Sequence, residues 1–196
     1  MCATSTSGAI HFFTGNDTAG FGNGSNTERM RIHPGGVVSF NNGIELGSGL
    51  DGTAANTLDD YEEGTFTPVY KTTGNNLGSV TYDQQTGRYT KIGRICYFTL
   101  RLRTDSISDV GTGSVRIDGL PFVAVNAGAH RAVTNIFSAN FTSTNAPTQG
   151  LMVQNVNEVQ LYQKDFNEDN TSFASTRLST GANSNDVRMT GWYEVN

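Results

Sequence analysis

Large apolar side chains in the first 58 residues occur in pairs separated by one residue, and turn-forming residues fill the segments between the pairs. Alternation with a period of two is the pattern of a β-strand, because successive side chains point to opposite faces. Segments such as "HPGG" and "NNG" favour turns. The pattern therefore predicts four short strands, built on Ile10 with Phe12, Met30 with Ile32, Val38 with Phe40, and Ile44 with Leu46.

Strands this short cannot bury a core of their own. Residues 1–58 hold 11 of the 23 glycines, and ordering such a chain costs more conformational entropy than four apolar pairs recover by burial. We therefore expect residues 1–58 to form a Gly-rich fibrous β shaft, in which several chains intertwine and share one narrow core. A flexible linker is the alternative, and the regular pairs argue against it.

Longer runs of the same alternation occupy residues 59–196. The apolar face of "RICYFTLRLRT" consists of Cys96, Phe98, Leu100 and Leu102. In "DVRMTGWYEV" the apolar face consists of Val187, Met189, Tyr193 and Val195, and Trp192 lies on the opposite face with Arg188, Thr190 and Glu194. No segment of helical length shows a 3.6-residue period. Residues 59–196 are therefore predicted to form an antiparallel, jelly-roll-like β-sandwich head with its own core.

Four carboxylates mark the border between the two regions, in "LDDYEEGTFTP" at residues 58–68. They are Asp59, Asp60, Glu62 and Glu63. Like charges this close would repel one another in a packed core, so we expect them at an exposed joint. In a trimer three such sets would meet, which requires either that they splay apart or that they bind a cation. No other cofactor is expected.

The composition excludes two classes of partner. The formal net charge is -5 and the 13 Lys and Arg residues form no run, so nucleic-acid binding is not expected. No apolar stretch approaches the ~20 residues that span a bilayer, and "MCATSTSGAI" lacks the features of a signal peptide. Cys2 and Cys96 fit neither a metal-binding spacing nor a disulfide framework.

Five phrases, taken in order along the chain, resemble segments of bacteriophage tail-fibre proteins and related virion adhesins. They are "NTERMRIHPGGVVSF", "LDDYEEGTFTPV", "VTYDQQTGRYTKIGRICYF", "VRIDGLPF" and "MTGWYEV". The resemblance covers residues 27–122 in patches and the last strand, and its motifs mark strands and turns. It implies a homotrimeric fibre tip that binds host surface structures, often glycans. Residues 126–185 match nothing in that family, and we expect them to form the loops that make the contact.

Motifs for catalysis are missing from the sequence. His11, His33 and His130 have no plausible catalytic partner, and no GxSxG elbow is present. Paired carboxylates that could cleave glycosides occur at the joint and in residues 165–173, both in predicted loops. The phrase "DFNEDNTSF" begins like a calcium loop, but Asn170 and Thr176 replace the required Gly and Glu. We therefore expect neither enzyme activity nor a metal site in this loop.

Aromatic side chains beside polar ones are the usual means of holding a sugar, because the ring stacks on the apolar sugar face while amides and carboxylates bind hydroxyls. The candidate ligand-binding residues are Tyr162, Asp165, Phe166, Asn167, Asp169 and Trp192. Trp192 has an alternative role in packing against a neighbouring subunit, since large aromatic residues dominate obligate interfaces. Arginines near the outer faces could pair with the joint acids, bind an anionic glycan or be solvated; they are Arg88, Arg94, Arg101, Arg103 and Arg116.

These observations together predict a non-enzymatic phage tail-fibre tip, located in the virion and acting outside the host cell. It would attach to a host-cell surface glycan or protein, and three weak sites on one homotrimer would raise the overall affinity. The alternatives are a purely structural collar or decoration protein, a polysaccharide depolymerase and a secreted lectin-like domain. Since no segment for attachment to the virion is recognised, we expect the chain to be a piece of a longer fibre.

Overall fold

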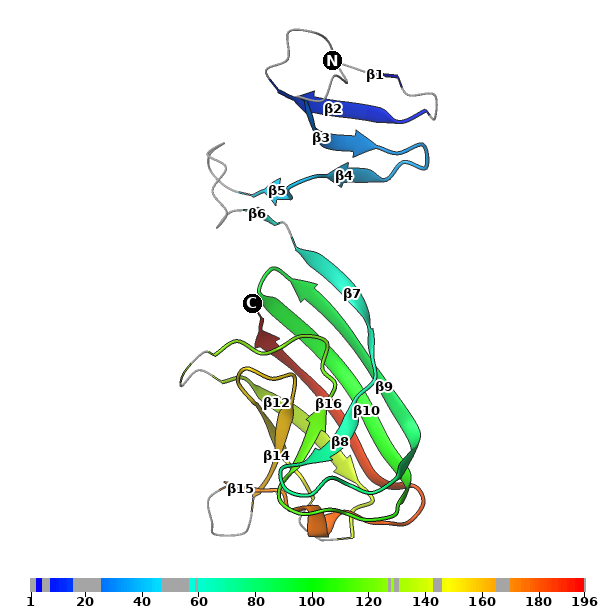
Figure 1. Cartoon of the computed structure of the whole chain (residues 1–196), viewed down its shortest axis with the longest axis vertical. Helices are drawn as coiled ribbons and strands as arrows, with labels where there is room; N and C mark the ends of the chain where they lie inside the picture. The colour runs from blue at the N-terminus through cyan, green and yellow to red at the C-terminus, as the bar shows by residue number, and fades with distance from the viewer. Residues whose placement is uncertain are drawn as a thin grey trace. The chain divides into compact units, whose positions relative to one another are not determined.

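The computed structural model describes residues 3–4, 8–15, 26–46, 57–58, 60–126, 128, 131–142, 146–164 and 170–195. The chain divides into two compact units, Met1–Asp60 and Tyr61–Asn196. Apart from one 3-10 turn at Ser175–Arg177, the regular elements of the described residues are β-strands. The predicted all-β fold is therefore confirmed (Figure 1).

Short strands make up the described part of the first unit. They are β1 (Ala3–Thr4), β2 (Ile10–Thr14), β3 (Thr27–Ile32), β4 (Val38–Phe40), β5 (Ile44–Glu45) and β6 (Thr57–Leu58). β1 to β4 form an antiparallel sheet in sequence order, and β5 pairs with β6. The four apolar pairs read from the sequence lie on β2, β3, β4 and at β5, so the predicted strands are confirmed.

One face of the β2–β3–β4 sheet is apolar, and no described strand packs over it. Phe12 pairs with Met30, and Met30 pairs with Phe40. Alternate residues share a face, so six side chains form what we name the apolar face of the first unit: Ile10, Phe12, Met30, Ile32, Val38 and Phe40. Phe12 and Phe40 leave 38% and 44% of their surface exposed. Exposed apolar surface of this kind is unfavourable in water and is typical of a surface that meets another layer.

The second unit is one curled antiparallel sheet (Figure 1). Its strands are β7 (Tyr61–Phe66), β8 (Val69–Thr72), β9 (Val80–Ile92), β10 (Ile95–Ile107), β11 (Val115–Asp118), β12 (Val133–Ala139), β13 (Gln149–Met152), β14 (Val159–Lys164), β15 (Asn170–Ser172) and β16 (Ser184–Glu194). The order across the sheet is β7-β9-β10-β16-β12-β13-β14-β11-β8, and β15 pairs with β14. The two halves of the curled sheet face each other and form the predicted sandwich.

The core of the second unit lies between the two halves of its sheet. The inward side chains of β10 and β16 meet those of β11 and β14; the buried set includes Cys96, Phe98, Leu100, Leu102, Val187, Met189, Tyr193, Val115, Ile117, Val159 and Leu161. Both faces of β10 and of β16 are those predicted from the alternation. The phenol of Tyr193 donates to the carbonyl oxygen of Phe122 at 3.1 Å, which satisfies its buried hydroxyl.

Glycines and aromatic rings alternate where β7 meets β9. Gly64 is opposite Tyr89, and Phe66 is opposite Gly87. A Cβ atom on Gly87 would lie 2.5 Å from the ring of Phe66, and one on Gly64 would lie 2.9 Å from the ring of Tyr89. Each ring therefore occupies the space that a side chain on its glycine partner would need. The acid-rich stretch thus runs directly into an edge strand of the sheet.

A buried asparagine holds an irregularity between β10 and β16. The register of this pair shifts between Leu102 and Thr104, and Asn185 adopts a φ of 52°. Its amide nitrogen donates to Thr104 Oγ1 and to the Ser179 carbonyl oxygen, both at 2.8 Å, and its amide oxygen accepts from the Ser179 nitrogen at 2.9 Å. Asparagine tolerates the left-handed region, and its side chain replaces the interrupted ladder bonds.

Replacing Asn185 by alanine should lower the free energy of unfolding by about 3 kcal/mol or more. The substitution removes the hydrogen-bond partner of Thr104 Oγ1 and of the backbone nitrogen and carbonyl oxygen of Ser179. Asn183 is the matched control, since it is exposed and also has a positive φ, 54°. Asn183→Ala should cost about 1 kcal/mol, the backbone contribution alone. Urea unfolding of the whole chain measures both variants, and equal losses would contradict the role of the hydrogen bonds.

Candidate functional site

The residues predicted to bind a ligand fall into two groups. Four of them lie outside the described residues, and their role stays a prediction; they are Asp165, Phe166, Asn167 and Asp169. Tyr162 lies on β14 and is half-buried, whereas Trp192 lies on β16 and is 50% exposed. β12 and β13 separate these two strands in the sheet. Tyr162 and Trp192 therefore do not form one contiguous site.

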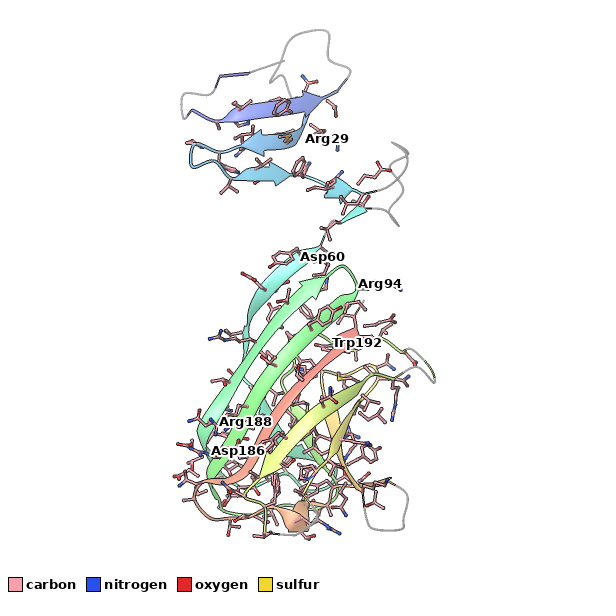
Figure 2. The ribbon with its side chains drawn as sticks, turned by 180° about the vertical axis from the view of Figure 1, so that it is seen from behind. Arg29, Asp60, Arg94, Asp186, Arg188 and Trp192 are labelled. Atoms are coloured by element: carbon pink, nitrogen blue, oxygen red, sulfur yellow. The ribbon has the colours of Figure 1, made fainter. Side chains whose placement is uncertain are left out.

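Trp192 shares the outer face of the sheet with a second exposed aromatic residue, Tyr97. The register of β10 and β16 places Tyr97 directly opposite Trp192. Their neighbours Phe98 and Tyr193 are buried in the core, so the strand alternation directs both rings outward. Tyr97 and Trp192 are 51% and 50% exposed. Figure 2 shows Trp192 on β16. Side chains in opposed positions have Cβ atoms roughly 5 Å apart, so Tyr97 and Trp192, which we name the aromatic pair, lie side by side on the outer face.

A hollow of about 200 Å³ lies beside the aromatic pair, and we name it the outer hollow. Outward side chains of β9, β10 and β16 line it: Arg88, Thr90, Tyr97, Thr99 and Thr190. Thr99 and Thr190 are directly opposite each other, and the hydroxyl of Thr190 donates to the Phe98 carbonyl oxygen at 3.3 Å. The outer hollow thus combines a ring face, hydroxyl groups and one guanidinium, which together suit a polyhydroxylated ligand.

A smaller pocket of about 110 Å³ also includes Trp192 in its lining. Met152 and Tyr193 contribute apolar surface, and the polar groups come from Arg131, Gln154 and Glu194. The amide nitrogen of Gln154 donates to the Gly128 carbonyl oxygen at 2.5 Å, which fixes that side chain. Trp192 therefore connects the aromatic pair to a second group of polar side chains.

Three of the arginines expected on outer faces are neutralised by acids of the second unit. The ion pairs are Arg101 with Asp186, Arg103 with Asp83 and Arg116 with Glu158. Hydrogen bonding to Asp186 raises the pKa of Arg101, and hydrogen bonding to Arg103 lowers the pKa of Asp83. The side chains of Arg88 and Arg94 form no ion pair or hydrogen bond with the described part of the chain. Arg101, Arg103 and Arg116 are thus paired with acids of the sheet. Arg88 and Arg94 remain available to a ligand.

The carboxylate of Glu158 is buried and held by two cations. It accepts hydrogen bonds from Lys71 Nζ at 2.5 Å and from Arg116 Nη1 at 2.7 Å, and Lys71 also donates to Asp118 at 3.2 Å. Burial opposes ionisation, but the hydrogen bonds from Lys71 and Arg116 outweigh it, so the pKa of Glu158 is lowered. A general acid needs the opposite shift. This carboxylate therefore stabilises the sheet and is a poor candidate for the general acid of glycoside cleavage.

The acids at the border of the two regions are bound by tyrosines. Glu62 accepts from the Tyr89 hydroxyl, and Glu63 accepts from the Tyr61 hydroxyl at 2.9 Å. These hydrogen bonds raise the pKa values of both phenols. Asp59 lies outside the described residues. Within the described ranges no group of three His, Cys, Asp or Glu side chains could hold a metal ion, and the expected cation between chains stays a prediction.

The sequence analysis identified Trp192 but missed its neighbours. The alternation placed Tyr97, Arg88 and Thr99 on outer faces of their strands, but no local pattern shows that β10 pairs with β16. Only the register of strands far apart in the sequence brings the aromatic pair and the outer hollow together. Phe173, the last residue of the phrase "DFNEDNTSF", is fully buried and packs edge-on against Phe141 with ring centroids 5.4 Å apart, so it is a core residue.

A phage protein and a tailspike protein are among the known proteins to which this chain is similar. No family model matches the chain. Over 85 residues, 43% of this chain, the sequence is 34% identical to a protein named as a capsule KN4-specific depolymerase of Klebsiella phage K64-1. The matched stretch spans 11% of that relative's length. Among solved structures, the Dettilon tailspike protein (gp208) gives a TM-score of 0.48 at 15% identity, with 69% of this chain and 24% of that chain covered.

The sequence match relates 43% of this chain to a small part of a phage depolymerase. It also corrects one prediction: the expectation of a chain without enzyme activity is contradicted, because the sequence relative is named as a depolymerase. That expectation rested on missing motifs. The matched stretch is a small part of a much longer depolymerase, and catalytic groups need not recur in every part of such a protein.

Replacing Glu158 by glutamine should lower the free energy of unfolding at pH 7 by about 2 kcal/mol or more, because Lys71 and Arg116 lose their anionic partner. The pKa of Glu158 is lowered in the folded state, so its contribution is fully present above its unfolded pKa of about 4.3 and is lost as the pH falls through the folded value. The difference from wild type should therefore shrink below about pH 4.

Urea unfolding at a series of pH values measures this difference. The control is Asp105→Asn, because Asp105 is exposed and forms no ion pair with a described residue. A difference for Glu158→Gln that does not change with pH would show that the two cations do not stabilise the ionised form.

Proposed function

We propose that this chain is the polysaccharide-binding part of a phage tail depolymerase, and that the outer face of its second unit binds bacterial capsular polysaccharide. The observation that carries the proposal is the aromatic pair, Tyr97 and Trp192, exposed beside the outer hollow. In this proposal the chain belongs to the virion and acts at the surface of the host bacterium. No helix of the described residues is long and apolar enough to cross a membrane.

The chemistry of the outer face supports a sugar ligand. Two half-exposed rings in opposed positions present a flat apolar area that water solvates poorly. The rows of side chains beside them are polar: Thr99 and Thr190 continue one row, and Arg88 is opposite Thr99. A pyranose has an apolar ring face and a rim of hydroxyls, so the rings can stack on the sugar while threonine and arginine bind its rim. This combination suits a glycan better than a purely apolar partner.

The name of the sequence relative supports the proposal that the ligand is a capsular polysaccharide and that the longer protein cleaves it. That protein is named as specific for a capsule and as a depolymerase. We infer that the protein to which this chain belongs cuts the polysaccharide that the chain binds. Binding on the outer face would keep a long polymer at the enzyme between cuts, because one strand of polymer contacts several sites at once.

A homotrimer is part of the proposal, and the first unit supports it. The apolar face of that unit is partly exposed, and among the described residues no strand packs over it. Burying Phe12 and Phe40 and their neighbours between copies would contribute roughly 1.5–3 kcal/mol for each large side chain that becomes fully buried.

Replacing Trp192 by alanine should weaken binding of the recognised polysaccharide by about tenfold, the effect of losing about 1.4 kcal/mol. Tyr97→Ala should have a similar effect because the two rings lie side by side. Tyr61→Ala is the matched control, since Tyr61 is an exposed aromatic residue on the edge strand β7. The measurement is binding of a panel of purified Klebsiella capsular polysaccharides by biolayer interferometry, with an assay for new reducing ends.

Two outcomes would contradict the proposed site. One is a protein that binds no polysaccharide of the panel. The other is a Trp192→Ala variant that binds as wild type does. Light scattering on the same variants tests the alternative role of Trp192, because a residue that packs between subunits would reduce the mass in solution when it is truncated, and polysaccharide contact would not.

Light scattering of the wild-type chain should give three times its mass of 21.0 kDa. Placing charges in the apolar face, by Phe12→Asp together with Phe40→Asp, should produce monomers, because a buried unpaired carboxylate costs several kcal/mol. Val37→Asp is the control; Val37 is 63% exposed and lies in the turn before β4, outside that face. A monomeric wild type, or dissociation by Val37→Asp alone, would contradict assembly through this face.

A further inference from the structure

We propose that the polysaccharide bound on the outer face is anionic, and that Arg88 and Arg188 bind its acidic groups. This inference rests on the proposed function and deepens it, because it assigns the chemical class of the ligand and two residues that determine specificity. It is argued from the charges on β9, β10 and β16, from the partners of each arginine and from the positions of these residues beside the aromatic pair.

Four arginines project from the outer face of these three strands: Arg88, Arg101, Arg103 and Arg188. Two of them are neutralised, Arg101 by a bidentate pair with Asp186 and Arg103 by Asp83. Arg88 and Arg188 form no ion pair with a described residue. Arg88 and Arg188 are thus the two arginines of this face without an acidic partner among the described residues, and Glu194, which shares the face, lies at the far end of β16 from Arg188.

Arg88 contributes the guanidinium of the outer hollow. It is exposed on β9, directly opposite Thr99 of β10, and Thr99 is directly opposite Thr190 of β16. The row next to this one holds the aromatic pair, since Tyr97 is two residues from Thr99 and Trp192 is two residues from Thr190. Positions two residues apart along a strand are about 6.8 Å apart. A sugar stacked on the aromatic pair would thus place its substituents within reach of this long side chain.

Arg188 lies one row beyond Thr190 on the other side, and Figure 2 shows it on the same strand as Trp192 and Asp186. Its guanidinium carbon lies over the ring of Phe137 at 5.8 Å from the centroid. Phe137 and Arg101 are its two cross-strand neighbours. Both oxygens of Asp186 are already bound by Arg101. The guanidinium of Arg188 therefore lies over an aromatic ring and beside another arginine, and the carboxylate of Asp186 is already bound by that second arginine.

Two cations in opposed positions of a ladder repel each other. Asp186 offsets the charge of Arg101, and an anion bound from outside would offset that of Arg188. Arginine suits this task because its planar fork binds both oxygens of a carboxylate or phosphate. Arg88 and Arg188 are two strand spacings of about 4.8 Å and one step of about 6.8 Å apart. A polymer that crosses the strands diagonally can therefore meet both with acidic groups of neighbouring sugars.

The test uses Arg88→Gln and Arg188→Gln, which remove charge from exposed side chains and keep their length. Each should weaken binding of the polysaccharide recognised in the panel by about five- to twentyfold, and Lys164→Gln should leave binding unchanged, because Lys164 is exposed on β14, away from these strands. Lysine at position 88 or 188 should restore part of the affinity, since the charge returns without the planar fork. Binding should also weaken as the salt concentration rises.

The probes are the same purified capsular polysaccharides in native and neutralised forms. Chemical reduction of carboxyl groups to alcohols removes carboxylates, and dephosphorylation removes phosphates, so the two treatments separate the two sources of acid. One of them should reduce binding by wild type at least tenfold and abolish the difference between wild type and the Gln variants. A native polysaccharide that binds as well after both treatments would overturn the inference while the proposed function stands. If no native polysaccharide binds, both fail.

Discussion

The two-residue period of β10 and β16 is the constraint on which the rest of the structure depends. The core requires Cys96, Phe98, Val187 and Met189 on one face, and a strand that buries those positions must turn the positions between them outward. Tyr97 and Trp192 are therefore exposed because their neighbours are buried. A shift of one residue in either strand would bury the arginines and expose the core, so folding itself fixes the composition of the outer face.

This constraint explains what could be predicted from the sequence. The faces of β10 and β16 follow from alternation, a local property, and so do the apolar pairs of the first unit. The site does not follow, because Tyr97 meets Trp192 only through pairing of strands that are distant in the sequence. The register also shifts between Leu102 and Thr104, where Asn185 replaces the regular ladder. No periodicity contains that information, so residues such as Arg88 and Thr99 could not be joined to Trp192.

The two units use the same alternation with different results. In the second unit the sheet curls, so its apolar face covers itself and leaves polar and aromatic side chains outside. In the first unit the strands are too short and too few to curl, and Ile10, Phe12 and Phe40 remain exposed on one face. A sheet needs a second layer before its apolar face is stabilised. The second unit supplies that layer itself, whereas the described strands of the first unit do not.

Some charged side chains of the second unit stabilise the fold, and others are assigned to the ligand in the proposed function. Glu158 is buried and binds Lys71 and Arg116, so these two ion pairs contribute to the fold. Arg188 is near Asp186, yet Asp186 is bound through both oxygens to Arg101. A sheet selected for stability alone would place an acid or a neutral residue opposite Arg101, because opposed like charges are unfavourable. Retaining Arg188 there is explained by a ligand that supplies the missing negative charge.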